Sequence, residues 1–273
     1  MKSATRTSSP LSRASEGSPL PPVVTPPALT SPCTFNVNVG APALVEPEFV
    51  SVTPSGRTTN GTTFDMSVPA HETGDLIVIC ATADYLNTAH VGDFTFVTPN
   101  GETVTTAQDW HSQGGTPGVE DNLKHSAALF WFVATADRTA GTMTANWSFS
   151  DTVNFAVIRM RKAKFKDTGV PVLAKSLNGA YASSIPSVAA MTGVQEKSRI
   201  FALAGTDNFS NDNFPPAGWT SRANFAPVSF HQLLLMERTA AATANENVAA
   251  TNFTTDTTFA WASIGFVVLP KGA

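Results

Sequence analysis

The feature that most constrains the fold is a pattern of aromatic and aliphatic residues that occurs twice, in residues 146–160 and again in residues 252–266. Each copy has an aromatic residue, a polar stretch and then an apolar run, and the second copy lies 106 positions after the first. An ungapped match of this kind predicts an internal duplication. The residue pairs at this spacing are Trp147 and Phe253, Phe155 and Trp261, Ile158 and Ile264, and Met160 and Phe266.

Each copy predicts a hairpin, in which a strand, a polar turn around Asp151 or Asp256 and a second strand share one buried face. A continuous apolar run at 74–84 is too short for a typical helix and predicts a central strand that is covered on both faces. No segment combines a long helical periodicity with capping residues. We therefore expect an all-β protein, a jelly-roll-like β-sandwich with internal duplication.

Composition divides the chain into three parts. Residues 1–33 are rich in Pro, Ser and Thr and predict a flexible, extended arm. This arm is either a disordered leader or an anchor that becomes ordered on a partner. Residues 34–165 and 166–273 are expected to form the first and second halves of the sandwich, because short β-prone segments separated by Gly and Pro recur in both.

The overall composition suits a globular body, since 42% of the 273 residues are hydrophobic and 14% are charged. The formal net charge of -4 argues against a general nucleic-acid or anionic-membrane binder, because neutralising phosphates needs an excess of Lys and Arg. Cys33 and Cys80 are too few and too differently placed for a disulfide framework, and we expect both to be reduced. No apolar stretch has the length of a signal-peptide core or a membrane span, so we expect synthesis in a cytoplasm without a signal peptide.

The sequence contains no recognisable catalytic or zinc-binding motif. None of the five histidines lies in an HExxH or HxH pattern, and there is no G-x-S-x-G nucleophile motif. The oxygen-bearing side chains of Asp207, Asn211 and Asp212 could bind calcium, although Asn and Asp also favour turns and the residue order of an EF-hand loop is missing. We therefore predict no enzyme activity and no cofactor, with calcium as the alternative. A hydrolase of unrecognised type stays open, because carboxylates are numerous.

Two groups of residues are candidate binding sites. Trp110, Trp219 and Tyr85 are expected in loops, where aromatic rings can stack on sugars, although Trp219 is better explained as a cap on one end of the sandwich. The charge cluster at 159–166 is either a solvated basic face beside a core residue or a docking patch for an acidic neighbour, with protein docking favoured over nucleic acid. Its basic residues are Arg159, Arg161, Lys162, Lys164 and Lys166.

Three segments carry a family resemblance. They are Pro-Pro-Ala-Gly-Trp-Thr at 215–220, Gly-Asp-Leu-Ile-Val-Ile at 74–79, and the closing aromatic and apolar strand at 261–269. Together they resemble a β-sandwich unit that recurs in two linked halves in structural proteins of tailed phages and prophages. The likeness covers about residues 64–270. The first half departs from the family pattern, because Thr98-Pro99-Asn100-Gly101-Glu102 stands where the Trp would lie.

The resemblance implies a virion protein, such as a tail fibre, spike or capsid decoration component, made in the host cytoplasm. It implies docking to other virion proteins through the arm, loops exposed to solvent or host, and a homo-oligomer, with a trimer favoured by analogy. No membrane contact and no direct nucleic-acid role are expected. The alternative function is a carbohydrate-binding module or lectin that binds a host-surface glycan through the aromatic side chains, with or without calcium.

Overall fold

The structure is a computed structural model of the 273-residue chain. It describes residues 42–56, 61–85, 94–111, 124–180, 184–206, 214–228, 231–255 and 260–273. For strand residues 84, 85, 110, 111, 124, 148–151 and 228 only the backbone is described. These residues contain no helix and form antiparallel sheets, so the predicted all-β class is confirmed. The predicted arm at 1–33, with Cys33, lies outside the described residues.

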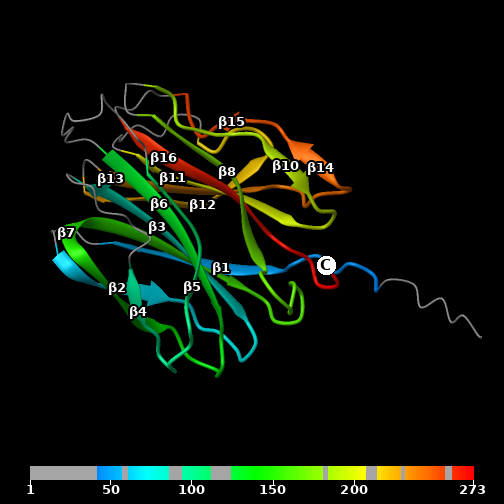
Figure 1. Ribbon diagram of the computed structural model, residues 1–273, viewed down its shortest axis with the longest axis horizontal. Helices are drawn as coiled ribbons and strands as arrows, with labels where there is room; N and C mark the ends of the chain where they lie inside the picture. Colours follow the sequence, from blue (N-terminus) through cyan, green and yellow to red (C-terminus); the bar gives the residue numbers. More distant parts are fainter. Residues whose placement is uncertain are drawn as a thin grey trace, which may run out of the picture. The chain divides into compact units, whose positions relative to one another are not determined.

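The first half builds a sheet with the strand order β1-β7-β3-β6-β5, in which all neighbours are antiparallel (Figure 1). The strands are β1 Phe49–Gly56, β3 Leu76–Tyr85, β5 Thr105–His111, β6 Lys124–Val133 and β7 Gly141–Met160. In β3, Leu76 and Val78 enter one hydrophobic core, and Ile77 and Ile79 enter another on the opposite face. The predicted central strand, covered on both faces, is therefore confirmed.

The second half builds a sheet with the order β12-β13-β11-β16-β8, again antiparallel. Its strands are β8 Val172–Ala180, β11 Arg199–Thr206, β12 Trp219–Val228, β13 His231–Arg238 and β16 Trp261–Val268. Read from its other edge, the order β8-β16-β11-β13-β12 matches β1-β7-β3-β6-β5 strand for strand. A shared order of this kind supports the internal duplication.

Each five-stranded sheet carries a smaller layer of strands on its outer side (Figure 1). In the first half, β2 (Gly61–Val68) and β4 (Thr95–Val97) pair with the N-terminal part of β7. In the second half, β10 (Met191–Val194) pairs with β14 (Glu246–Val248), and β9 (Ser187–Val188) pairs with β15 (Thr251–Asn252). The described strands thus form four layers.

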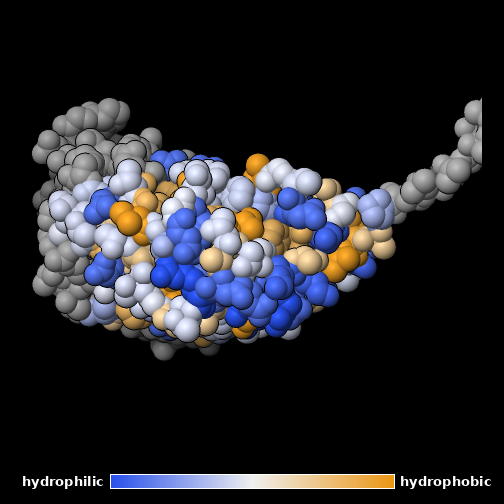
Figure 2. Space-filling view, turned by 90° about the horizontal axis from the view of Figure 1, so that it is seen from below, coloured by the Kyte–Doolittle hydropathy of each residue, from blue (hydrophilic) through white to orange (hydrophobic). Residues whose placement is uncertain are grey.

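Three hydrophobic cores separate these layers. The central core lies between the two five-stranded sheets and includes Ile158, Met160, Ile264 and Phe266. The first outer core lies under β2 and β4 and includes Phe64, Trp147 and Phe155. The second outer core lies under the layer of β9, β10, β14 and β15 and includes Val188, Met191 and Phe253. Residues on the solvent side of β2 and β7, such as Thr63, Asp65 and Thr142, are exposed. The view from below in Figure 2 shows a group of hydrophilic residues over the middle of the molecule.

Three of the residue pairs of the duplication occupy matching environments. Met160 and Phe266 lie in the central core, as do Ile158 and Ile264. Trp147 and Phe253 each lie in the outer core of their own half.

The two five-stranded sheets face each other about a pseudo-two-fold axis. At its centre β3 packs against its counterpart β11. At the edges β1 packs against β12 and β5 against β8, and between them β7 packs against β13 and β6 against β16. Because β12 is the counterpart of β5 and β8 is the counterpart of β1, exchanging the halves reproduces the same contacts. This is the geometry of an isologous dimer interface within one chain.

The prediction of a hairpin at 146–160 is wrong. β7 runs from Gly141 to Met160 without a break, so Asp151 lies inside a strand. Asn146 pairs with Thr63 of β2, whereas Val153 pairs with Ala83 of β3. The polar stretch therefore marks the place where β7 passes from the outer layer to the five-stranded sheet, and a strand that changes sheets needs a bend and not a turn. The corresponding Asp256 lies outside the described residues.

The described chain starts beside its own C-terminal end. Val45 and Lys271 form an antiparallel bridge, with both N–H···O bonds at 3.0 Å. The Glu46 carboxylate binds Arg199 of β11 at 2.9 Å. In Figure 1 this first segment, coloured blue, lies at the marked C-terminus. Both halves belong to one compact unit, residues 41–273, and the predicted boundary at 165/166 stays a prediction.

Candidate functional site

The aromatic residues predicted to bind sugar lie on strands and not in loops. Trp110 belongs to β5 and Tyr85 ends β3, and only their backbones are described. The loop placement was wrong because β5 is an edge strand with the polar sequence TTAQDWH, which lacks the apolar run of a central strand. Trp219 opens β12 and packs against the second outer core, as the alternative of a cap predicted. Sugar binding by Trp110 and Tyr85 stays a prediction.

The predicted docking patch is largely neutralised by carboxylates of the same chain. Arg159 binds Asp75 at 2.6 Å, Arg161 binds Glu48 at 2.5 Å, and Lys162 binds Glu72 at 2.9 Å. Within the described part of the chain, Lys164 and Lys166 have no carboxylate partner. These ion pairs fasten the end of β7 to the segments before β1 and β3, so the charge that remains for docking lies on Lys164 and Lys166.

The predicted calcium ligands Asp207, Asn211 and Asp212 lie outside the described residues, so this alternative stays a prediction. Among the residues that are described, no group of three or more His, Cys, Asp or Glu side chains could hold a metal ion. Cys80 is fully buried in β3, and its burial raises the pKa of the thiol. Such a thiol behaves as a small core hydrophobe. No helix in the described part of the chain is long and apolar enough to cross a bilayer.

Two histidines meet at one end of the central core, although no motif connects them in the sequence. His125 of β6 and His231 of β13 have ring centroids 5.6 Å apart, and their exposed fractions are 1% and 0%. The His231 Nε2 atom lies 3.0 Å from the Thr82 hydroxyl of β3. Burial lowers the pKa of His125 to about 3, and burial together with the neighbouring His125 lowers the pKa of His231 well below its usual value. Both rings are therefore neutral at pH 7.

The signal that relates these histidines in the sequence is their spacing, since His231 lies 106 positions after His125, the same shift as the duplication. Equivalent positions near a two-fold axis face each other. The pair could have been predicted from the spacing of the repeat, but not from the spacing of a metal-binding motif.

A buried carboxylate occupies the opposite end of the central core. Glu237 of β13 is 1% exposed and binds the guanidinium groups of Arg199 and Arg222. Arg222 also lies over the ring of Phe49 in β1, with 4.0 Å between its Cζ atom and the ring centroid. The two ion pairs lie within the second half, and Glu237 holds the Arg222 side chain whose cation–π contact with Phe49 joins the two halves. We assign this cluster to the stability of the interface.

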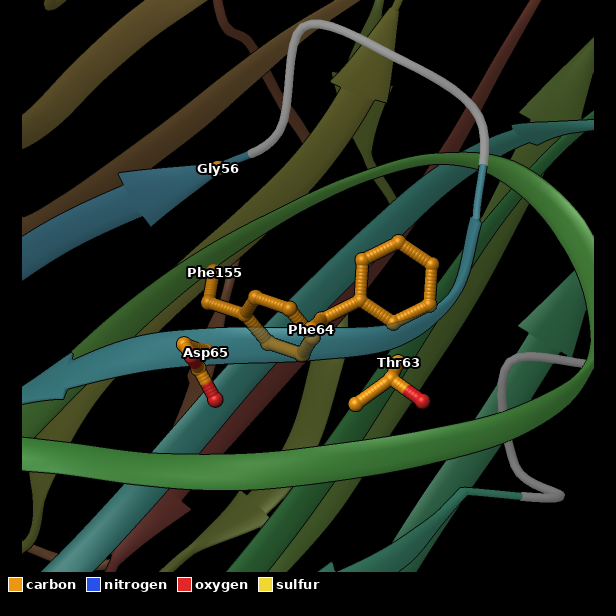
Figure 3. Close-up of a pocket in the computed structure, with 5 residues that line it drawn as sticks. All are labelled: Gly56, Thr63, Phe64, Asp65 and Phe155. Carbon is orange, nitrogen blue, oxygen red and sulfur yellow. The ribbon is translucent and has the colours of Figure 1, made fainter.

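One pocket, of about 340 Å³, opens between β1, β2 and β7 (Figure 3). Thr63 and Asp65 lie on the side of β2 away from Phe64, whose ring turns toward the ring of Phe155. The two rings are 2% and 1% exposed, so they offer a ligand little surface to stack on. The Asp65 carboxylate already accepts a hydrogen bond of 2.8 Å from a hydroxyl of β7. The polar groups of this pocket are thus satisfied within the protein.

A second pocket, of about 280 Å³, has polar groups that are not satisfied. It lies where β2 ends and β7 begins, and its walls are Val68, His71, Pro99, Arg138, Thr139, Ala140, Gly141 and Thr142. His71 is 4% exposed, and its Nε2 atom is buried without a hydrogen-bond partner among the described residues. Leaving a buried polar atom without a partner costs about 1–3 kcal/mol. We therefore take this pocket as the candidate functional site.

The fold and these sites define an all-β sandwich protein built from two copies of one sheet unit. Comparison of the chain with models of protein families, with curated proteins and with solved structures finds no match. The predicted likeness to tailed-phage virion proteins therefore remains a prediction.

Proposed function

We propose that the chain is a non-enzymatic structural or adhesion protein of a virion, attached to the particle through its N-terminal arm. The observation that carries the proposal is that the first described segment is attached to the sheets. Val45 is hydrogen-bonded to Lys271 through the backbone, and Glu46 forms an ion pair with Arg199. The chain before residue 42 is therefore joined to the body at a defined point. Such an attachment point suits an anchor, because a force on the arm would be transmitted directly to the sheets.

The arrangement of the strands gives a second reason. β1, β3 and β11 all begin at the end of the sandwich where residues 42–46 are attached, as their pairing with β7 and β16 requires. Attachment at this end would leave the opposite ends of these strands facing solvent or host.

The test uses particles purified from cells that carry the gene. We expect the full chain to sediment with the particles in a density gradient and to be detected there by mass spectrometry. A variant that lacks residues 1–41 should keep the β-rich circular dichroism spectrum and the thermal midpoint of the body but be lost from the particle fraction. Absence of the full chain from the particles would contradict the virion assignment.

A second variant separates the arm from the basic residues. Lys164→Gln with Lys166→Gln removes the two cations of the predicted patch that lack a carboxylate partner in the described residues. If the arm is the anchor, this variant stays with the particles. Retention of the truncated chain and loss of the Lys variant would move the docking role from the arm to the patch.

A further inference from the structure

The pocket beside His71 offers one hydrogen-bond acceptor, because a backbone contact fixes the tautomer of the ring. The His71 Nδ1 atom lies 2.9 Å from the carbonyl oxygen of Pro69. Since a carbonyl oxygen can only accept, Nδ1 carries the hydrogen, and in the neutral ring Nε2 holds the lone pair. A group that satisfies Nε2 must therefore donate a hydrogen bond, as a hydroxyl does.

The same pocket offers one cation. Arg138 is exposed, and within the described residues its guanidinium has no carboxylate partner. Its backbone is bonded to that of His71 in both directions, at 3.0 and 2.8 Å, so the two residues are held side by side. A guanidinium recognises a carboxylate through two parallel N–H···O bonds. A carboxylate of a ligand bound in the pocket would therefore suit the Arg138 guanidinium.

The remaining walls limit the size and the character of the ligand. Thr139 and Thr142 bring hydroxyl groups that can donate or accept, and Val68 and Pro99 form an apolar side. The pocket volume of about 280 Å³ is just below the usual range of ligand pockets, which begins at about 300 Å³. The space suits one sugar ring and not a longer ligand.

We propose that this pocket binds an acidic sugar, a single ring that carries both hydroxyl groups and a carboxylate. One hydroxyl donates to His71 Nε2, and the carboxylate accepts from Arg138. The site uses none of the aromatic side chains and no metal ion. It goes beyond the proposed virion role, and its test uses the isolated protein, so the failure of one proposal leaves the other standing.

The first experiment is calorimetric titration of the full chain at pH 7. Glucuronate is the probe, glucose supplies the hydroxyls without the carboxylate, and acetate supplies the carboxylate without the hydroxyls. We expect saturable binding of glucuronate, with glucose and acetate at least about tenfold weaker, since each lacks one of the two recognised groups. Absence of saturable glucuronate binding, or equal binding of glucose or acetate, overturns the proposal.

A second titration identifies the source of the sugar. An oligosaccharide that ends in a uronic acid is compared with free glucuronate. Equal affinity per chain end assigns the pocket to the terminal ring of a glycan, whereas binding of the monosaccharide alone assigns it to a free acidic sugar.

Three variants test the named contacts. Arg138→Gln removes the cation at an exposed position and should weaken glucuronate binding about tenfold. In His71→Asn the amide can still donate to the Pro69 carbonyl but has no atom in place of Nε2, and a loss of about fivefold is expected. Lys175→Gln, a charge-matched control on β8, should bind like the unmodified chain.

Thermal midpoints of all three variants show that they are folded. If His71→Asn does not fold, Thr142→Val, an exposed pocket residue on β7, takes its place, with a loss of about threefold expected. Full affinity in Arg138→Gln together with full affinity in the second variant overturns the assignment of the site.

Discussion

The stability of the protein should fall steeply in mild acid because of the histidine pair at the end of the central core. Both rings are buried and neutral, so acid can protonate them readily only in the unfolded chain. Their folded-state pKa values are lowered, to about 3 for His125, against about 6.5 in the unfolded chain. The stabilising contribution is therefore complete above pH 6.5 and is lost as the pH falls from there toward the folded-state values.

The size of the effect follows from proton linkage. Below about pH 6.5 each pH unit removes about 1.4 kcal/mol per neutral histidine until its folded-state pKa is reached. Between pH 7 and pH 5 the loss is about 2 kcal/mol for each ring and about 4 kcal/mol for the pair. A total free energy of unfolding is about 5–15 kcal/mol, so this loss is large. Glu102, with a pKa lowered to about 2, loses its stabilising contribution only at lower pH.

Urea denaturation followed by circular dichroism at pH 7, 6 and 5 measures the free energy of unfolding directly. The matched variant is His231→Gln, because a glutamine amide can still bond to the Thr82 hydroxyl but does not titrate. We expect the loss between pH 7 and pH 5 to fall from about 4 to about 2 kcal/mol in this variant. Equal losses in the two proteins would refute the reasoning, as would no loss in the unmodified chain.

Two further substitutions probe the contact between the halves. A side chain at Gly205 would place its Cβ 2.9 Å from the Cβ of Thr82, so Gly205→Val should destabilise the protein by about 1–3 kcal/mol. Gly141→Ala should cost little, because the nearest atom to its added Cβ is 4.0 Å away. Thermal midpoints that fall equally in the two variants would argue against a close approach of the sheets. Glu237→Gln leaves the Arg222 guanidinium without its buried carboxylate and should cost about 2–4 kcal/mol in urea denaturation. An unchanged midpoint in that variant would show that the carboxylate is not needed at the interface.

The architecture was readable where the sequence pattern reflects burial directly. The apolar run at 74–84 is too short for a typical helix and predicts a strand buried on both faces, and the 106-residue shift predicts the duplication that the matching strand orders support. The same reasoning failed at β7, because a polar stretch looks the same whether the chain turns back or crosses between layers. It also failed at β5, since an edge strand needs only part of one face to be apolar.

The sites were less readable, because they depend on residues that meet only after folding. The basic residues Arg159 and Arg161 form a cluster in the sequence, but the carboxylates that neutralise them, Asp75 and Glu48, lie more than 80 positions away. His71 shows the same limit in a different form. Its importance depends on one hydrogen bond that fixes its tautomer and on an Arg138 that lies beside it across a backbone bridge, and neither has a sequence signature.

The pseudo-two-fold interface has a consequence for assembly. The linker between the halves makes their meeting intramolecular, so its strength does not depend on protein concentration. The faces that in a free dimer would recognise a second copy are already occupied by the other half of the same chain. Any ring or cluster of several chains, including the trimer expected by analogy, must therefore be built from the outer layers, the sheet edges or the arm.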